Sequence, residues 1–389
     1  MTRTTVTVKL KRRSASRLPN PFSPMSQSSN TSVQPGQAIA CSISDSFISW
    51  MSQAQGAIAL TTYQANKVAF IAWNGQQVTL LMRQFPKPMG LAVGEQCLAL
   101  ATREQVYIFA NAPQLANSYL EDQPGRYDTL YLPRVVYFTG DLNTHDLVFG
   151  QDCLWLVNTR FSCLARLSNQ FNFIPHWQPK FISQLVPEDR CHLNGLALVN
   201  NRPKYVTALG ESDVVGGWRA DKATGGILID VENSDILLRG LSMPHSPHWH
   251  QGYLWLLNSG KGELWRVHPQ TLQHDVVCIL PGFLRGLTFV GSYALVGLCQ
   301  IRERHIFGNL PVQERFRQLL CGVAIVDLQN GQTVGMLEFT AGCQELYAVQ
   351  FLPSVFRPNI LNAERVEIYQ AFTAPGIDYW LRPSAEIQD

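Results

Sequence analysis

The chain has 389 residues, of which 46% are hydrophobic, 10% aromatic and only 15% charged, and its formal net charge is +2. This composition excludes an intrinsically disordered chain and indicates a well-buried core. Beyond residue 44 the chain carries 25 basic and 29 acidic residues, so it lacks the basic folded surface that a nucleic-acid-binding domain needs.

Residues 1–44 differ in composition from the rest. They hold six basic residues and no acidic residue, which predicts a disordered basic tail; a transit peptide, an over-long start or a linker has the same composition. Neither a secretory signal nor a membrane-spanning run is visible in the sequence. The nine cysteines contain no Cys-x-x-Cys pair. We therefore expect reduced, packed thiols in a cytoplasmic protein.

The first predicted strands lie between residues 56 and 85. Three short runs rich in β-branched and aromatic residues occupy positions 58–62, 68–73 and 78–82, and runs of this kind indicate strands. These three runs are not preceded by the sequence motif that begins each copy of the repeat in the next paragraph.

A repeat follows, and residues 145–166 return at 245–266 without a gap. Eight positions are identical: His145/His245, Gln151/Gln251, Leu154/Leu254, Trp155/Trp255, Leu156/Leu256, Asn158/Asn258, Leu164/Leu264 and Arg166/Arg266. Weaker copies begin at Met89, Asn194, Arg285 and Tyr347, which makes six starts.

Modules of four short strands at this spacing are typical of β-propeller blades. We therefore predict an all-β, six-bladed β-propeller over residues 45–362, with a C-terminal extension at 363–389. The strand at 348–352 would join the three N-terminal strands and close the ring. Seven blades are the alternative if residues 47–51 and the segment after Pro358 form further strands.

Several motifs between residues 47 and 362 resemble a bacterial family of conserved hypothetical proteins, sometimes fused to other domains. The resemblance implies a soluble, propeller-like domain of unknown function and transfers no catalytic residues. The motifs are Leu60-Thr-Thr-Tyr-Gln-Ala-Asn-Lys, Arg83-Gln-Phe-Pro-Lys-Pro-Met-Gly-Leu-Ala, Tyr119-Leu-Glu-Asp-Gln-Pro-Gly-Arg-Tyr-Asp, Asn158-Thr-Arg-Phe-Ser, Pro187-Glu-Asp-Arg-Cys-His-Leu-Asn-Gly, Met243-Pro-His-Ser-Pro and Gly282-Phe-Leu-Arg-Gly-Leu.

The six repeat starts predict a ring of side chains around the propeller axis, and five of the six are polar. Two imidazoles with an amide oxygen and a carboxylate suit a divalent metal such as Zn, Mn or Fe, and Ca is a further possible metal through the oxygen ligands. The predicted metal ligands are His145, His245 and His192, the predicted catalytic residues are Arg285, Tyr347 and Glu345, and Asn194 is predicted to bind ligand. The alternative is a water-lined channel whose polar residues bond one another.

Loops that rise over the same rim supply further candidates. Several carry arginine, which favours a small anionic molecule or peptide as ligand; the alternative is that each arginine pairs with a neighbouring acid. The predicted ligand-binding residues here are Arg103, Arg160, Arg302, Asn158 and Asn258. For the two asparagines, blade packing and turn capping are the simpler roles.

Two classes of function follow. The first is a ligand-binding propeller, in its catalytic form a metal-dependent lyase or hydrolase acting on an anionic substrate. The second is a non-catalytic scaffold that binds a protein partner through its rim loops. The repeat itself favours neither class, because propellers serve both.

Overall fold

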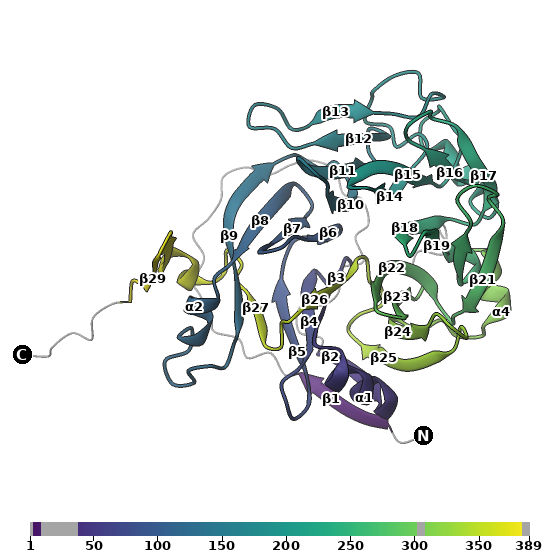
Figure 1. Ribbon diagram of the computed structural model, residues 1–389. Coiled ribbons are helices and arrows are strands. Elements are labelled where there is room, and N and C mark those ends of the chain that lie inside the picture. Colours follow the sequence, from purple (N-terminus) through teal and green to yellow (C-terminus); the bar gives the residue numbers. More distant parts are fainter. Residues whose placement is uncertain (1–2, 9–37, 302–307, 383–389) are drawn as a thin grey trace, which may run out of the picture.

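The computed structural model describes residues 3–8, 38–301 and 308–382. Within them, six four-stranded antiparallel blades surround a central axis (Figure 1), which confirms the predicted six-bladed propeller. The strands of each blade are given from the axis outward. Blade 1 consists of β26 (Val349–Pro353), β3 (Gly56–Thr62), β4 (Lys67–Trp73) and β5 (Val78–Gln84), and blade 2 of β6 (Leu91–Val93), β7 (Cys97–Ala101), β8 (Gln105–Asn111) and β9 (Thr129–Phe138). Blade 3 consists of β10 (Thr144–Phe149), β11 (Leu154–Asn158), β12 (Cys163–Arg166) and β13 (Ile174–Trp177).

Blades 4 to 6 repeat this order. Blade 4 consists of β14 (Leu193–Val199), β15 (Arg202–Ala208), β16 (Gly226–Asp230) and β17 (Ile236–Leu241), and blade 5 of β18 (Pro244–His250), β19 (Tyr253–Asn258), β20 (Glu263–Val267) and β21 (His274–Ile279). Blade 6 consists of β22 (Phe283–Val290), β23 (Tyr293–Cys299), β24 (Gly322–Asp327) and β25 (Thr333–Ala341).

Face-to-face packing of neighbouring blades explains the continuous apolar runs in the sequence. All seven residues of β3 and all five of β11 are buried, because both faces of an inner strand contact a neighbouring blade. Strands buried on both faces lose the polar alternation of a half-exposed strand. The core is therefore a ring of interblade clusters, such as the one that joins Trp155 of blade 3 to Val206 of blade 4.

Ring closure occurs as predicted, through the C-terminal strand. Strand β26 pairs antiparallel with β3, with Val349 opposite Leu60 and Pro353 opposite Gly56. At Gly56 a Cβ atom would lie 2.4 Å from the Leu352 carbonyl oxygen, so the close approach of the two strands requires glycine there.

The seven-blade alternative is wrong. Residues 47–51 lie in helix α1 (Asp45–Gln53), which Ser44 caps by accepting a hydrogen bond from the Phe47 amide at 3.2 Å. The segment after Pro358 forms β27 (Pro358–Ile360), which pairs in parallel with β9 at the outer edge of blade 2. Neither segment adds a blade.

The predicted tail includes ordered strands at its two described parts. Strand β2 (Ile39–Ser44) pairs with β25 at the outer edge of blade 6, and β1 (Arg3–Val8) pairs with β2. Disorder was therefore the wrong expectation for residues 39–44. Buried Ile39, Cys41 and Ile43 alternate with less buried residues, which is a strand signal, and they anchor β2 in the core. The rest of the predicted tail lies outside the described residues.

Short elements decorate the propeller. They are α2 (Pro113–Asn117), η1 (Gly217–Asp221), η2 (Ser259–Lys261), α4 (Pro311–Arg315), η3 (Val366–Tyr369) and the hairpin of β28 (Ala371–Ala374) and β29 (Ile377–Trp380). In the described part of the chain no helix is long and apolar enough to cross a membrane. All nine cysteines are described, and none forms a disulfide.

We expect Leu352→Ala to lower the free energy of unfolding by about 2–5 kcal/mol, because it removes a fully buried side chain from the closing strand. Denaturant unfolding measures this loss. Val214→Ala, at a side chain that is 65% exposed, is the control and should change stability by less than about 0.5 kcal/mol. A Leu352 variant as stable as the wild type would contradict closure through β26.

Candidate functional site

The predicted ring residues lie at irregular starts of the innermost strands. Each of β10, β14, β18 and β22 has a register shift in its first residues, at or beside His145, Asn194, His245 and Arg285 respectively. A β-bulge redirects one side chain out of the regular alternation and is common beside active sites. The same device in four blades thus turns four polar side chains toward one end of the axis.

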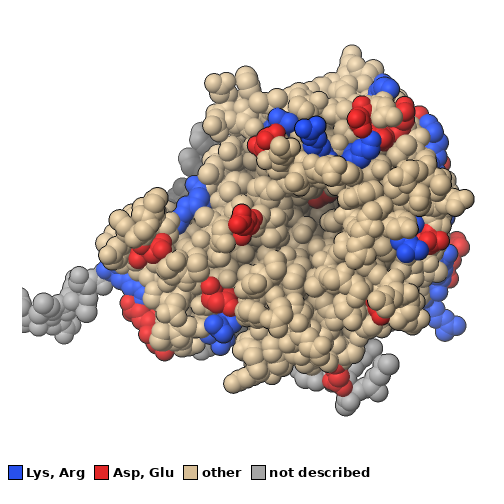
Figure 2. Space-filling view, viewed as in Figure 1, with Lys and Arg blue, Asp and Glu red and all other residues tan. Residues whose placement is uncertain are grey.

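A cavity of about 490 Å³ opens at this end, and the face in Figure 2 is hollowed near its centre. The walls come from the strand starts of several blades and from loops 187–192 and 215–219. Of the predicted residues, His145, His192, Arg285, Tyr347, Glu345 and Arg160 line it.

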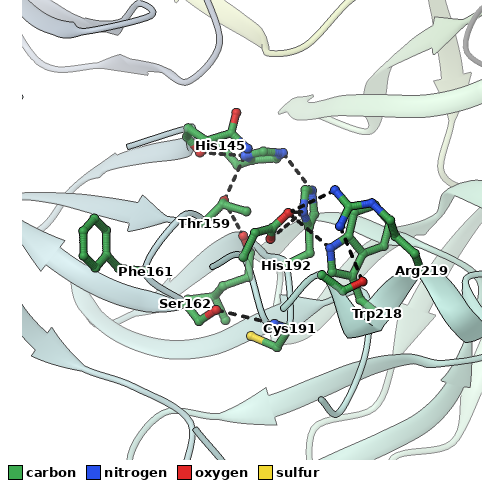
Figure 3. Close-up of polar contacts among 12 residues, drawn as sticks. His145, Thr159, Phe161, Ser162, Cys191, His192, Trp218 and Arg219 are labelled. Atoms are coloured by element: carbon green, nitrogen blue, oxygen red, sulfur yellow. Dashed lines mark hydrogen bonds and ion pairs between the residues drawn. The ribbon is translucent and has the colours of Figure 1, made fainter. Parts of the chain in front are cut away.

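Two imidazoles meet in the wall of this cavity (Figure 3). The Nδ1–H of His145 donates to the Asn143 carbonyl oxygen at 2.7 Å. His192 Nδ1–H donates to the Asp189 carboxylate, 2.9 Å from each oxygen. The two Nε2 atoms lie 3.1 Å apart.

These contacts determine where the hydrogens are. Because each Nδ1 faces an oxygen acceptor, each ring carries hydrogen on Nδ1 and, when neutral, a lone pair on Nε2. Two lone pairs at hydrogen-bond distance repel, so the contact requires one proton or one cation between His145 and His192. Burial, and secondly the neighbouring His192, hold the pKa of His145 well below its usual value. The Asp189 carboxylate lies on the His192 side of this contact.

The loop around Asp189 completes this half of the site and was missed from the sequence. Trp218 of η1 donates its Nε1–H to Asp189 at 3.1 Å and packs on the His192 ring. Asp189 and His192 both have left-handed backbones, with φ values of 50° and 52°. Such strain in non-glycine residues is concentrated at functional sites. The one sequence signal was an acid three residues before a histidine.

The other half of the site is built on Arg285. Its Nε–H donates to His245 Nε2 at 3.3 Å, and its guanidinium lies 5.0 Å from the centre of the Tyr347 ring. His245 Nδ1–H donates to the Met243 carbonyl oxygen at 2.8 Å, so His245 has the same tautomer as His145. Burial, and secondly Arg285, hold the pKa of His245 well below its usual value.

Two buried polar atoms beside the ring have no hydrogen-bond partner within the described part of the chain. They are the Tyr347 hydroxyl and the Asn194 Nδ2, in side chains of residues only 6% and 3% exposed. Both residues border a small space of about 30 Å³ beneath the ring. An unsatisfied buried polar group costs about 1–3 kcal/mol, so both groups can donate a hydrogen bond to a bound ligand.

The three predicted metal ligands are not equivalent in the structure. His145 and His192 are together, whereas the Nε2 of His245 is occupied by Arg285. Over the described ranges no three His, Cys, Asp or Glu side chains are grouped to hold a metal ion. Among the described residues, two imidazoles, those of His145 and His192, are thus placed to bind one metal ion.

The predicted loop residues are scattered. Arg160 lines the cavity but pairs with Asp141 at 3.0 Å. Arg103 is exposed and does not line it. Asn158 and Asn258 are fully buried. The Asn158 Oδ1 accepts from the Phe161 amide in the following turn, which is the capping role, whereas the Asn258 Oδ1 accepts from the Ser242 amide just before β18. Arg302 lies outside the described residues.

We expect His145 and His245 to stay neutral, with hydrogen on Nδ1, at pH 6, where a free imidazole is mostly protonated. The physical reason is that burial disfavours both imidazolium ions. Imidazole ¹⁵N chemical shifts, assigned with His145→Gln and His245→Gln variants, report the state of each ring. Protonation of both nitrogens of either ring at pH 6 would contradict this geometry.

Comparison with solved structures finds matches of low similarity. A chain of a nidogen/laminin complex has 9% identity and a TM-score of 0.44 over 77% of this chain and 98% of that chain. A protein of unknown function from Bacteroides caccae has 8% identity and a TM-score of 0.47 over 77% and 99%. A streptogramin B lyase has 12% identity and a TM-score of 0.40 over 69% and 88%. Similarity this low carries no argument about function.

A search of curated proteins finds no match. A family model does match, over residues 45–361, and it agrees with the resemblance seen in the sequence motifs. Because the match covers most of the chain, this protein belongs to the family described as Domain of unknown function (DUF4915).

Proposed function

We propose that the axial cavity binds a small organic anion and that His192 and His145 transfer a proton to or from it. One observation carries the proposal: the 3.1 Å contact between two Nε2 atoms whose Nδ1 partners are both acceptors. This contact stores a proton, or a cation in its place, in the wall of a cavity large enough for a ligand.

Arg285 supports an anionic ligand. Its residue is only 8% exposed, and a guanidinium in such surroundings forms strong charge-assisted hydrogen bonds with carboxylate or phosphate. The neighbouring Tyr347 hydroxyl has no partner among the described residues and is available to donate to the same anion. Burial raises the pKa of Tyr347 well above its usual value, so it stays protonated and acts as a donor.

The histidine pair supports acid–base chemistry on that anion. The proton held between the Nε2 atoms of His145 and His192 passes to an oxygen of the substrate, after which both imidazoles are neutral. The pair regains one proton when the product or water returns it. Lyases and hydrolases of anionic substrates use this kind of step, and the proposal assigns this protein to that class.

We expect citrate or inorganic phosphate to bind, with Arg285→Gln weakening the binding about tenfold or more through loss of a charge-assisted hydrogen bond. Isothermal titration calorimetry measures the affinity. Arg103→Gln, an exposed arginine away from the cavity, is the matched control and should bind as the wild type does. Equal affinities of the wild type and Arg285→Gln would contradict anion binding at the axial site.

A divalent metal is the second candidate, and the same contact favours it. Two imidazole nitrogens on one tetrahedral zinc ion lie about 3.3 Å apart, close to the 3.1 Å found here. Acceptors behind the Nδ1 atoms are also usual for metal-binding histidines. A bound anion or water would have to complete the coordination.

Elemental analysis of the purified protein separates the two candidates. If the pair holds a proton, we expect less than about a tenth of an equivalent of Zn, Mn, Fe or Ca after dialysis without chelator. Near one equivalent that is lost in both His145→Ala and His192→Ala, with circular dichroism unchanged, would favour the metal. Absence of metal together with absence of anion binding would leave the rim-loop scaffold as the function.

A further inference from the structure

The sequences of blades 3 and 5 align without a gap over residues 145–166 and 245–266. Of these two blades, only blade 3 borders a large cavity away from the axis at the described residues. This cavity has a volume of about 430 Å³. It lies between blades 3 and 4, beside the β10–β11 turn at 151–153 and the β14–β15 turn with the first residues of β15 at 201–203. These turns are at the strand ends opposite the ring residues, so the cavity is separate from the axial site.

Aromatic and cationic side chains share this second cavity. Trp155, His176 and Trp177 line it, together with Arg166 and Arg202. The Trp155 and His176 rings meet edge to face with centres 4.8 Å apart, and the Arg166 guanidinium lies 4.4 Å from the Trp155 ring. The walls therefore offer both stacking surfaces and positive charge.

The equivalent place in blade 5 shows what is missing here. Arg266, the counterpart of Arg166, forms an ion pair of 2.8 Å with Asp275, its neighbour across the strand pair. In blade 3 the residue opposite Arg166 is Ile174, which has no charge. Arg166 instead interacts with the Cys153 thiol, a weak and neutral partner.

A second difference opens the space. The counterpart of Cys153 is Tyr253, whose ring lies 5.0 Å from the Arg266 guanidinium. In blade 5 the Tyr253 ring and the Asp275 carboxylate thus both contact Arg266. Blade 3 lacks both groups and has a cavity in their place.

We propose that this interblade cavity binds a planar aromatic carboxylate. The ligand ring takes the place that Tyr253 fills in blade 5, against Trp155 and His176, and its carboxylate takes the place of Asp275, beside Arg166. Arg202 adds a second positive charge, while Asp152 also lines the cavity and disfavours ligands of higher negative charge. A volume of 430 Å³ suits a ligand of two fused rings.

2-Naphthoate is a suitable probe, and Trp155 and Trp177 make its binding visible as quenching of tryptophan fluorescence. We expect the quenching to saturate with a stoichiometry of one 2-naphthoate per chain. 2-Naphthamide, which lacks the negative charge, should bind at least tenfold more weakly. Arg166→Gln should weaken 2-naphthoate at least tenfold, whereas Arg266→Gln, the matched substitution in blade 5, should leave it unchanged.

Substitutions copied from blade 5 test the cavity itself. Cys153→Tyr fills the space and Ile174→Asp supplies the missing carboxylate, so each should weaken 2-naphthoate at least tenfold; Ile174 is 44% exposed, and circular dichroism checks the fold of both variants. Excess citrate should not displace 2-naphthoate, which separates this site from the axial one. Quenching that is absent, displaced by citrate, or equal in the Arg166 and Arg266 variants would overturn the proposal.

Discussion

Closure of the ring by β26 against β3 is the constraint on which the rest of the structure depends. Six blades packed face to face leave the first and last blades to meet, and an open pair of edges would expose apolar faces and unpaired backbone groups. The chain solves this by supplying the inner strand of blade 1 from its C-terminal part. The same solution places Tyr347, the residue two before β26, opposite His145 and Arg285 at the axis.

The arrangement of the inner strands also explains why the axial site is polar. Inner strands start close together around the axis, and bulges in four blades turn polar side chains into the space between them. The hydrogen bonds of these side chains are only partly internal. Fixed acceptors hold the Nδ1–H groups of His145, His192 and His245, whereas Tyr347 and Asn194 retain unpartnered atoms within the described residues. A site with fixed tautomers and spare donors is preorganised for a ligand.

Much of the fold could be predicted because repeats reveal equivalent places. The identities between residues 145–166 and 245–266 located His145 and His245 at matching bulges. The contact between His145 and His192 could not be predicted in the same way, because it depends on a left-handed turn in a loop that belongs to no repeat. Residue type alone also misled at Asn158 and Asn258, whose Oδ1 atoms accept from the backbone amides of Phe161 and Ser242.

A crystal structure of the protein soaked with citrate, with anomalous data collected above the zinc edge, tests the central claim most directly. The account predicts a citrate carboxylate within hydrogen-bond distance of Arg285 and the Tyr347 hydroxyl, and no anomalous peak between the Nε2 atoms of His145 and His192. An anomalous peak between those atoms, or citrate bound only elsewhere on the protein, would contradict it.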